Sequence, residues 1–471
     1  MPHIATTNPA TGQVLKTYEA MSTEQIDAAI ERTDLAYQQL RGTTVDQRAR
    51  WMKAAADLLD AERDEIARIM TTEMGKTYVA AQAEVTKCAM AARFYADKAP
   101  AFLADEPADS TAVKAIRAFV RYQPIGVVLA VMPWNFPLWQ VMRFAAPALM
   151  AGNTGLLKHA SNVPQTALLL EDVFRRAGFP EGAFTTLLVG SEAVERILAD
   201  PRVRAATLTG SEAAGRSIAQ IAGRELKKTV LELGGSDPFV VMPSADVERA
   251  AEVATTARCQ NNGQSCIAAK RFIVHTDVFD AFAEKFAANM AALRVGDPME
   301  PDTDVGPLAS ERGRDEVHAQ VRDAADNGAT VLCGGELPAG DGWFYPPTVV
   351  TDLTPQMRMW SEEVFGPVAG LYRVSSYEEA IEVANGTSFG LGSNAWTRDK
   401  AEQERFATDL DAGNVFINGM TTSYPELPFG GVKNSGYGRE LSALGMREFC
   451  NTKTVWVGEG AASAGAGAHA E

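Results

Sequence analysis

Two hydrophobic periodicities divide the chain. Residues 23–103 carry apolar side chains at three- and four-residue steps, as in QRARWMKAAADLLDAERDEIARIM, which predicts long amphipathic helices. From residue 125 onward, short β-branched runs such as GVVLAVM, TGLLKHA and VRAATLTG alternate with helical stretches such as LWQVMRFAAPALMAG and PQTALLLEDVFRRAG. This alternation predicts a parallel, doubly wound α/β sheet. Ligands of such sheets bind at the carboxyl ends of the strands.

The alternation starts again after Gly235. PFVVM and KRFIVH have the pattern of buried strands, and ADVERAAEVATTARC and VFDAFAEKFAANMAAL that of helices. We therefore expect a second α/β domain that extends to about residue 418. The last residues, AASAGAGAHAE, are small and polar, so we expect a disordered tail over 461–471.

Charge and composition narrow the class of protein. The 471 residues carry a formal net charge of -16, which argues against nucleic acid or an anionic membrane as the main partner. The most apolar segment, IGVVLAVMPWNFPLW, is interrupted by Pro133, Asn135 and Pro137 and is too short for a membrane helix. The N-terminus lacks the pattern of a signal peptide. These features predict a cytoplasmic protein with a small-molecule partner.

Five cysteines are present, two of them in CQNNGQSCIAAKR at Cys259 and Cys266. The others, Cys88, Cys333 and Cys450, stand alone and form no CxxC or Cys/His cluster, so we expect no metal site and no disulfide. Cys266 is then either a reactive thiol or a buried, inert side chain. For an arbitrary cysteine, the inert alternative is favoured.

A glycine turn follows one predicted strand in VRAATLTGSEAAG. Gly210 and Ser211 there open a helix, and a helix N-terminus is a ready site for a phosphate group. A single GS pair is a weak signal, because Ser is also a common helix N-cap. Lys158 and Ser161 of LLKHAS strengthen it, since they end a neighbouring strand.

Six motifs occur in the order found in aldehyde dehydrogenases: PWNFPL, TGSEAAG, LELGG, NNGQSC, EEVFGPV and PFGGVKNSGYGRE. The chain resembles this superfamily over nearly its whole length, from about residue 8 to 457. Within it, the chain is most similar to the bacterial NADP-linked succinate-semialdehyde dehydrogenases. Because six motifs in order are not expected by chance, the resemblance reverses the inert interpretation of Cys266.

The resemblance implies a catalytic role for three residues. Cys266 is the expected nucleophile, which adds to the aldehyde and later carries the acyl group as a thioester. Asn135 and the Cys266 backbone N–H are the expected oxyanion donors. Glu232 of LELGG is the expected base that activates water for hydrolysis of the thioester.

The cofactor is expected to be NADP, with NAD as the alternative. The resemblance places ten residues at the dinucleotide: Trp134, Lys158, His159, Ala160, Ser161, Gly210, Ser211, Leu233, Glu363 and Phe365. Members that favour NAD commonly carry a glutamate where this chain has Ser161. Serine can donate to a 2′-phosphate that a carboxylate would repel. His159 departs from the motif and is expected to add a donor.

The expected substrate is a short aldehyde with a distal carboxylate. Arg143 lies about two helical turns beyond the Asn135 loop, and the resemblance places a carboxylate-binding arginine there. Many relatives carry a second arginine where this chain has Gln260. One cation in place of two predicts weaker affinity and broader specificity, with Gln260 and either Ser423 or Tyr424 as additional donors.

The resemblance also divides the chain. Residues 1–109 and 128–233 are expected to form the dinucleotide-binding domain, 234–427 the catalytic domain, and 110–127 and 428–460 a small β extension that joins subunits. An unpaired edge strand is covered in most proteins, so we expect a homodimer or homotetramer.

Three other functions fit the sequence less well. A cysteine hydrolase needs a histidine base, and none of the five histidines stands in such a motif. A coenzyme A-acylating dehydrogenase is disfavoured by Glu232, which those relatives lack. A non-catalytic binding protein on the same fold stays open, because fold does not fix function, but the intact set of Cys266, Glu232 and Asn135 disfavours it.

Overall fold

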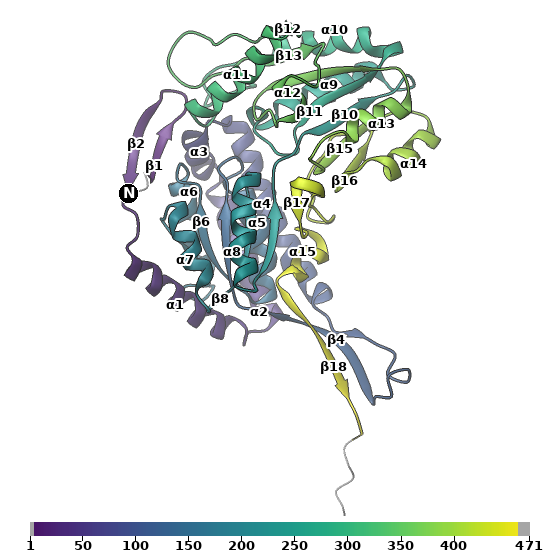
Figure 1. The fold of residues 1–471 in the computed structure, drawn as a ribbon. Helices are drawn as coiled ribbons and strands as arrows, with labels where there is room; N and C mark the ends of the chain where they lie inside the picture. Colours follow the sequence, from purple (N-terminus) through teal and green to yellow (C-terminus); the bar gives the residue numbers. More distant parts are fainter. Residues whose placement is uncertain (1–3, 460–471) are drawn as a thin grey trace, which may run out of the picture.

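The computed structural model describes residues 4–459 and contains two large sheets, one above the other in Figure 1. The first has the strand order β17-β9-β8-β5-β6-β7. Its strands are β5 (Val127–Met132), β6 (Thr154–His159), β7 (Phe184–Thr186), β8 (Val203–Thr209), β9 (Lys228–Glu232) and β17 (Gly436–Tyr437). All neighbours are parallel except β17, which is antiparallel to β9. The predicted doubly wound sheet is confirmed.

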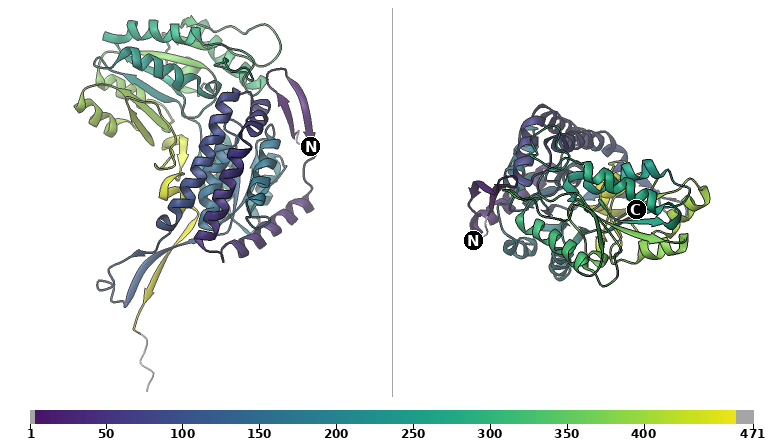
Figure 2. Two further views of the ribbon diagram at one scale, coloured as in Figure 1. Left: turned by 180° about the vertical axis from the view of Figure 1, so that it is seen from behind. Right: turned by 90° about the horizontal axis from the view of Figure 1, so that it is seen from above.

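Helices cover both faces of this sheet because its strands are apolar on both sides. Val128 and Ala130 of β5 pack in one hydrophobic cluster, and Val127 and Leu129 in another, as the two-residue period of a strand requires. The helices on the two faces are α1 (Thr23–Leu40), α2 (Val45–Ala61), α3 (Arg63–Met74), α4 (Tyr78–Phe102), α5 (Trp139–Ala151), α6 (Pro164–Arg176), α7 (Val194–Ala199) and α8 (Glu212–Arg224). The long helices of the first cluster are in front when the molecule is seen from behind (Figure 2).

The second sheet has the order β12-β13-β14-β11-β10-β15-β16, and only β12 is antiparallel to its neighbour. Its strands are β10 (Asp237–Val241), β11 (Ala269–His275), β12 (Thr330–Cys333), β13 (Thr348–Thr351), β14 (Val368–Val374), β15 (Gly392–Trp396) and β16 (Asn414–Ile417). The helices around it are α9 (Val247–Cys259), α10 (Thr276–Ala292), α11 (Glu311–Asp326), α12 (Arg358–Ser361), α13 (Tyr377–Asn385) and α14 (Lys400–Asp409). The expected second α/β unit is therefore present.

The carboxyl ends of the strands of the first sheet face the amino ends of the strands of the second sheet. The carboxyl ends of β5 and β8 lead into Pro133 and Gly210, and the chain reverses its winding direction between these two strands. A crevice forms at such a switch point. Glu363 and Cys266, in contrast, come just before β14 and β11 of the second sheet. The crevice of the first unit is thus closed by segments from the amino end of the second.

Two smaller sheets complete the fold. One pairs β1 (Ile4–Asn8) with β2 (Gln13–Tyr18). The other has the order β18-β4-β3, formed by β18 (Cys450–Val457), β4 (Arg117–Pro124) and β3 (Glu106–Pro107), and it projects from the body in Figure 1.

The segment 428–460, predicted as one extension, is divided in the structure. Gly436–Tyr437 joins the edge of the first large sheet, and α15 (Ser442–Glu448) packs against α5 and α4. Only β18 belongs to the projecting sheet. At the other end, β3 falls before residue 110, so the projecting sheet begins earlier than predicted. β17 was not predicted because it has only two residues and lies in the glycine-rich run PFGGVKNSGYGRE, which has no strand periodicity.

Three further expectations from the sequence concern the C-terminal tail, membrane-spanning helices and metal sites. The predicted tail, 461–471, lies outside them. Within residues 4–459, no helix has the length and apolar character needed to cross a membrane. Across the same residues, no three His, Cys, Asp or Glu side chains gather as metal ligands would.

Candidate active site

The turn before Cys266 is unusual in its backbone. Asn261, Asn262 and Gly263 all have positive φ, at 55°, 58° and 74°. A Cβ at Gly263 would overlap the backbone of Gly366, so only glycine fits there. The Asn262 amide fixes the turn: its nitrogen donates to Gly75 O at 2.8 Å and its oxygen accepts from Gly306 N at 2.8 Å. The strained turn is therefore anchored from both units.

Cys266 is half-buried at the end of this turn. Burial raises the pKa of its thiol to about 12, and the positive charges of Arg143 and Lys270 oppose this only in part. Lys270 Nζ holds the segment by donating to Ser265 O at 2.8 Å and to Cys266 O at 2.6 Å. At neutral pH the thiol is protonated in this state, so it becomes a strong nucleophile only after losing its proton.

Asn135 lies in the loop between β5 and α5. Its side-chain nitrogen donates to Gln264 O at 3.1 Å, two residues before Cys266, and its side-chain oxygen is buried without a donor. Among the described residues, the Cys266 amide has no hydrogen-bond acceptor. An amide side chain and a free backbone N–H thus lie next to the thiol.

Two buried side chains hold the Asn135 loop. Glu84 of α4 accepts from Leu138 N at 2.9 Å and from Trp139 N at 2.8 Å, which satisfies the first amides of α5. Lys76 forms a buried ion pair with Glu84. Sequence motifs gave no sign of this pair, because it lies in the helical N-terminal region.

His159 does not face the cofactor crevice as predicted. Its ring is buried: Nε2 lies 2.9 Å from Pro137 O, and Nδ1 accepts from Ala160 N at 2.9 Å. Burial lowers the pKa of His159 to about 4, so the ring is neutral and its Nε2–H donates to Pro137 O. The expectation of an extra donor to the dinucleotide is wrong, because Nε2–H holds the Asn135 loop through Pro137 O and Nδ1 accepts from Ala160 N.

The crevice at the switch point contains a cavity of about 240 Å³. It is lined by Pro133, Trp134, Asn135, Gln140, Thr209, Gly210, Ser211, Leu233, Gly234, Cys266, Glu363 and Phe365. The structure therefore brings six of the ten predicted cofactor residues together around Cys266. Lys158, Ala160 and Ser161 lie outside the lining, at the carboxyl end of β6, where Lys158 is paired with Val131 of β5.

Residues on either side of the cavity are held in place. Glu363 Oε1 lies 3.1 Å from Lys270 Nζ and accepts from Gly235 N at 3.2 Å. Phe365 packs edge-on against Trp134, with ring centroids 5.8 Å apart. The aromatic pair thus joins the two units at the cavity, and the Glu363 carboxylate comes from the second unit.

A second cavity, of about 110 Å³, adjoins the first. It is lined by Lys87, Phe136, Trp139, Gln140, Arg143, Gln260, Ser265, Cys266, Ile267, Met420, Thr421, Thr422, Ser423 and Phe429. All three predicted substrate residues, Arg143, Gln260 and Ser423, are here, whereas Tyr424 is 46% exposed and lines neither cavity. Cys266 and Gln140 line both cavities, so the thiol lies where the two meet.

Arg143 is buried rather than solvated, and its charge is not free. Its guanidinium forms an ion pair with buried Glu440 and lies 4.6 Å from the centre of the Phe429 ring. Sequence reasoning missed Glu440 as its partner, because the two residues lie in distant segments. It also missed Lys87 of α4, whose Nζ lies 2.9 Å from Ser423 Oγ.

Glu232 is the last residue of β9 and lies outside both cavity linings. Both carboxylate oxygens are buried without a hydrogen-bond partner. Burial raises the pKa of Glu232 well above its usual range, and the neighbouring Glu440 carboxyl raises it further, while Arg143 and Arg439 oppose this. Relative to a glutamate in water, the protonated form of this carboxyl group is therefore favoured in this conformation.

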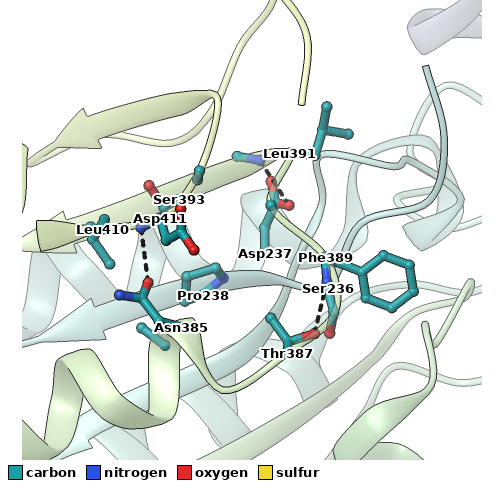
Figure 3. Close-up of a pocket in the computed structure, with 14 residues that line it drawn as sticks. Ser236, Asp237, Pro238, Asn385, Thr387, Phe389, Leu391, Ser393, Leu410 and Asp411 are labelled. Atoms are coloured by element: carbon teal, nitrogen blue, oxygen red, sulfur yellow. Dashed lines mark hydrogen bonds between the residues drawn. The ribbon is translucent and has the colours of Figure 1, made fainter. Parts of the chain in front are cut away.

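Another small cavity is lined by residues that follow β9 and α13, among them Ser236, Asp237 and Phe389 (Figure 3). It encloses only about 10 Å³, about the space of one water molecule, and its lining includes Asp237 but not Cys266. Asp237 Oδ1 accepts from Gly392 N at 3.1 Å, and burial raises the pKa of this carboxyl to about 7. The cavity is too small for a substrate.

Comparison with known proteins identifies the family. The model of the aldehyde dehydrogenase family matches residues 2–455. The succinate-semialdehyde dehydrogenase [NADP(+)] of Mycolicibacterium paratuberculosis is 66% identical over 470 residues, covering 99% of this chain and 100% of the relative. Succinate-semialdehyde dehydrogenase [NADP(+)] 1 of Mycobacterium tuberculosis H37Rv is 66% identical over 454 residues, covering 96% of this chain and 99% of the relative.

A solved structure has the same fold. The succinic semialdehyde dehydrogenase of Streptococcus pyogenes, crystallised with NADP+ as the cofactor, superposes with a TM-score of 0.94. It is 40% identical, and the match covers 97% of this chain and 100% of that one.

Proposed function

The chain belongs to the aldehyde dehydrogenase family, and from this premise we propose that it oxidises succinate semialdehyde to succinate with NADP. One observation carries the proposal: Cys266 lies at the junction of a cavity at the switch point and a second cavity lined by cationic side chains. The first suits a dinucleotide and the second a small anionic aldehyde. The names of the mycobacterial and streptococcal relatives support the same substrate and cofactor.

The residues of the first cavity fit NADP. Ser211 caps α8, whose N-terminal amides and dipole favour a phosphate. A Cβ on Gly215 would lie 2.7 Å from Leu233 Cδ1, so glycine lets the first turns of α8 approach Leu233 without displacing that side chain. Lys158 forms no ion pair with any described residue, which leaves its charge for a ligand. NADP bound there supplies the hydride acceptor.

In the proposed reaction, the Cys266 thiol gives its proton to solvent, and its sulfur forms a bond to the carbonyl carbon while the π electrons of the C=O bond move to the oxygen. Asn135 Nδ2 and the Cys266 N–H donate to the resulting oxyanion. Departure of the hydride leaves a thioester on Cys266. Glu232, once ionised and turned toward the thioester, takes a proton from water, whose oxygen attacks the acyl carbon and releases the acid and the Cys266 sulfur. Hydrolysis explains why a glutamate stands at this position.

Steady-state kinetics test the proposed function. Succinate semialdehyde, glutarate semialdehyde and butanal would each be assayed with NADP and with NAD, in the presence and absence of coenzyme A. We expect the highest kcat/KM for succinate semialdehyde with NADP, and no requirement for coenzyme A. A higher kcat/KM for butanal would point to a broad-specificity dehydrogenase, and a requirement for coenzyme A to an acylating one.

The preference for NADP is proposed to depend on Ser161, which is half-buried after β6. Replacing it by glutamate places a carboxylate near the adenosine ribose, where it repels a 2′-phosphate and accepts from ribose hydroxyls. We expect Ser161→Glu to lower the ratio of kcat/KM for NADP to that for NAD at least about tenfold. Ser161→Gln, of matched size without charge, serves as the control. Equal ratios in both variants would exclude the electrostatic explanation.

We also propose that the projecting sheet joins subunits. β18 is paired only with β4 among the described residues, so its other edge is open. Trp456 within β18 is 54% exposed, and Ile116, just before β4, is 63% exposed. An open edge next to apolar side chains favours pairing with another chain. We expect at least a dimer in light scattering at micromolar concentration. A monodisperse monomer would contradict this assignment.

A further inference from the structure

We propose that Lys87, together with Ser423, binds the distal carboxylate of the substrate and is a determinant of specificity for it. The proposal rests on the proposed function and deepens it, because it assigns the second cation of the substrate cavity to a helix outside all recognised motifs. It also changes an expectation: the position of Gln260 suggested a single-cation pocket, whereas the cavity contains both Arg143 and Lys87.

The contacts around Ser423 leave a donor available for a ligand. Ser423 is buried, and its Oγ accepts from Lys87 Nζ at 2.9 Å and from Trp139 Nε1 at 3.0 Å. A hydroxyl that accepts two hydrogen bonds still has its own proton to donate. Lys87 Nζ also lies 4.2 Å from the centre of the Trp139 ring, which fixes the side chain in the cavity wall. Ser423 and Lys87 thus present O–H and N–H groups together.

The charges of the cavity indicate which cation is free. Arg143 is paired with Glu440, so this pair adds little net charge. Lys87 has no carboxylate within ion-pair distance among residues 4–459. It is therefore the cation of the cavity whose charge no described side chain compensates. A half-buried ammonium without a counter-ion is costly, and an anionic ligand would remove that cost.

Further donors in the same cavity also lack acceptors. Arg143 Nη2 and Gln260 Nε2 are both buried without a hydrogen-bond partner. Together with Lys87 and Ser423, they make a donor-rich wall in a cavity that also contains Cys266. A carboxylate, which accepts at two oxygens, matches such a wall, whereas an alkyl chain leaves the donors unpaired.

The protonation of Lys87 is compatible with this role. Burial lowers its pKa to about 8, and the positive charge of Arg143 on α5 lowers it further, while Cys88 and Glu84 on its own helix raise it. Lys87 is thus mostly charged at pH 7, and its charge is lost as the pH rises through about 8. We expect the KM for succinate semialdehyde, but not for butanal, to increase above that pH.

The test compares Lys87→Met with Lys98→Met. Methionine keeps an unbranched apolar stem against Trp139 and removes the charge. Lys98 is an exposed lysine of the same helix outside the cavity, so its replacement is the matched control. We expect Lys87→Met to raise the KM for succinate semialdehyde roughly tenfold to hundredfold, with kcat and the KM for butanal nearly unchanged. The pH dependence of the KM above pH 8 should disappear, and Lys87→Arg should restore affinity in part.

Thermal unfolding and NADP titration of each variant show whether the fold and cofactor site are intact. An equal rise of KM for both aldehydes, or no rise for succinate semialdehyde, would overturn the role of Lys87 even if the wild-type enzyme prefers that substrate. A wild-type enzyme without preference for succinate semialdehyde over butanal would instead overturn the proposed function. The two failures are therefore distinguishable.

Discussion

Replacement of Cys266 by alanine is expected to abolish aldehyde oxidation, with a loss of kcat on the order of 10⁴-fold or more. Without the sulfur, the carbonyl carbon cannot become tetrahedral, and no hydride can leave. The side chain is half-buried and alanine is smaller, so the fold and the larger cavity should persist. Loss of activity with unchanged NADP affinity, measured by isothermal titration, would support the assignment.

Cys333→Ala is the control for this experiment. Cys333 is also half-buried, but it lies in β12 and lines neither cavity. Its replacement should leave kcat unchanged. Substantial steady-state turnover by Cys266→Ala would mean that another group attacks the aldehyde.

Replacement of Glu232 by glutamine is expected to slow steady-state turnover about 10²- to 10⁴-fold, while a first burst of reduced cofactor remains. The burst persists because thiol addition and hydride departure precede the step that needs the base. Rapid-mixing absorbance at the reduced nicotinamide band would measure both phases. A steady-state rate equal to that of the wild type would remove Glu232 from the mechanism.

The pH dependence of the wild type and of Glu232→Gln provides a second test of the role of Glu232. Because burial and the neighbouring Glu440 raise the pKa of Glu232, its base form accumulates only at a higher pH than that of an ordinary glutamate. Hydrolysis of the thioester should therefore accelerate with pH in the wild type, and this dependence should be lost in Glu232→Gln. Glu171→Gln, at a carboxyl whose pKa burial also raises but which lies outside both cavities, should keep it.

The positions of the strand ends could be predicted because they follow from the local pattern of apolar residues. The periodicity of GVVLAVM and VRAATLTG predicts parallel strands, and the carboxyl ends of parallel strands share one edge. Gly210 follows one of these strands, the resemblance assigned both Trp134 and Gly210 to the dinucleotide, and the structure brings the two to one cavity. The role of Cys266 could not be predicted in this way. Only the resemblance to the family, and not the spacing of the cysteines, distinguished it from an inert cysteine.

Side-chain direction and distant pairing were not predictable. His159 follows Lys158 in the motif, yet its ring turns toward Pro137 because the Asn135 loop offers it a carbonyl. Arg143 had no visible partner in its helix, since Glu440 comes from the glycine-rich C-terminal segment. Lys87 was overlooked because a lysine on an amphipathic helix is ordinarily solvated. Each of these contacts joins segments far apart in the sequence.

The most direct test of the account is the mass of the acyl-enzyme. Glu232→Gln, mixed with NADP and succinate semialdehyde and quenched in acid, should gain the mass of one succinyl group per chain, and peptide mapping should place it on Cys266. The gain should require NADP, because without hydride departure no stable thioester forms. Absence of the adduct, or a succinyl group on another residue, would contradict the central claim that Cys266 carries the substrate between oxidation and hydrolysis.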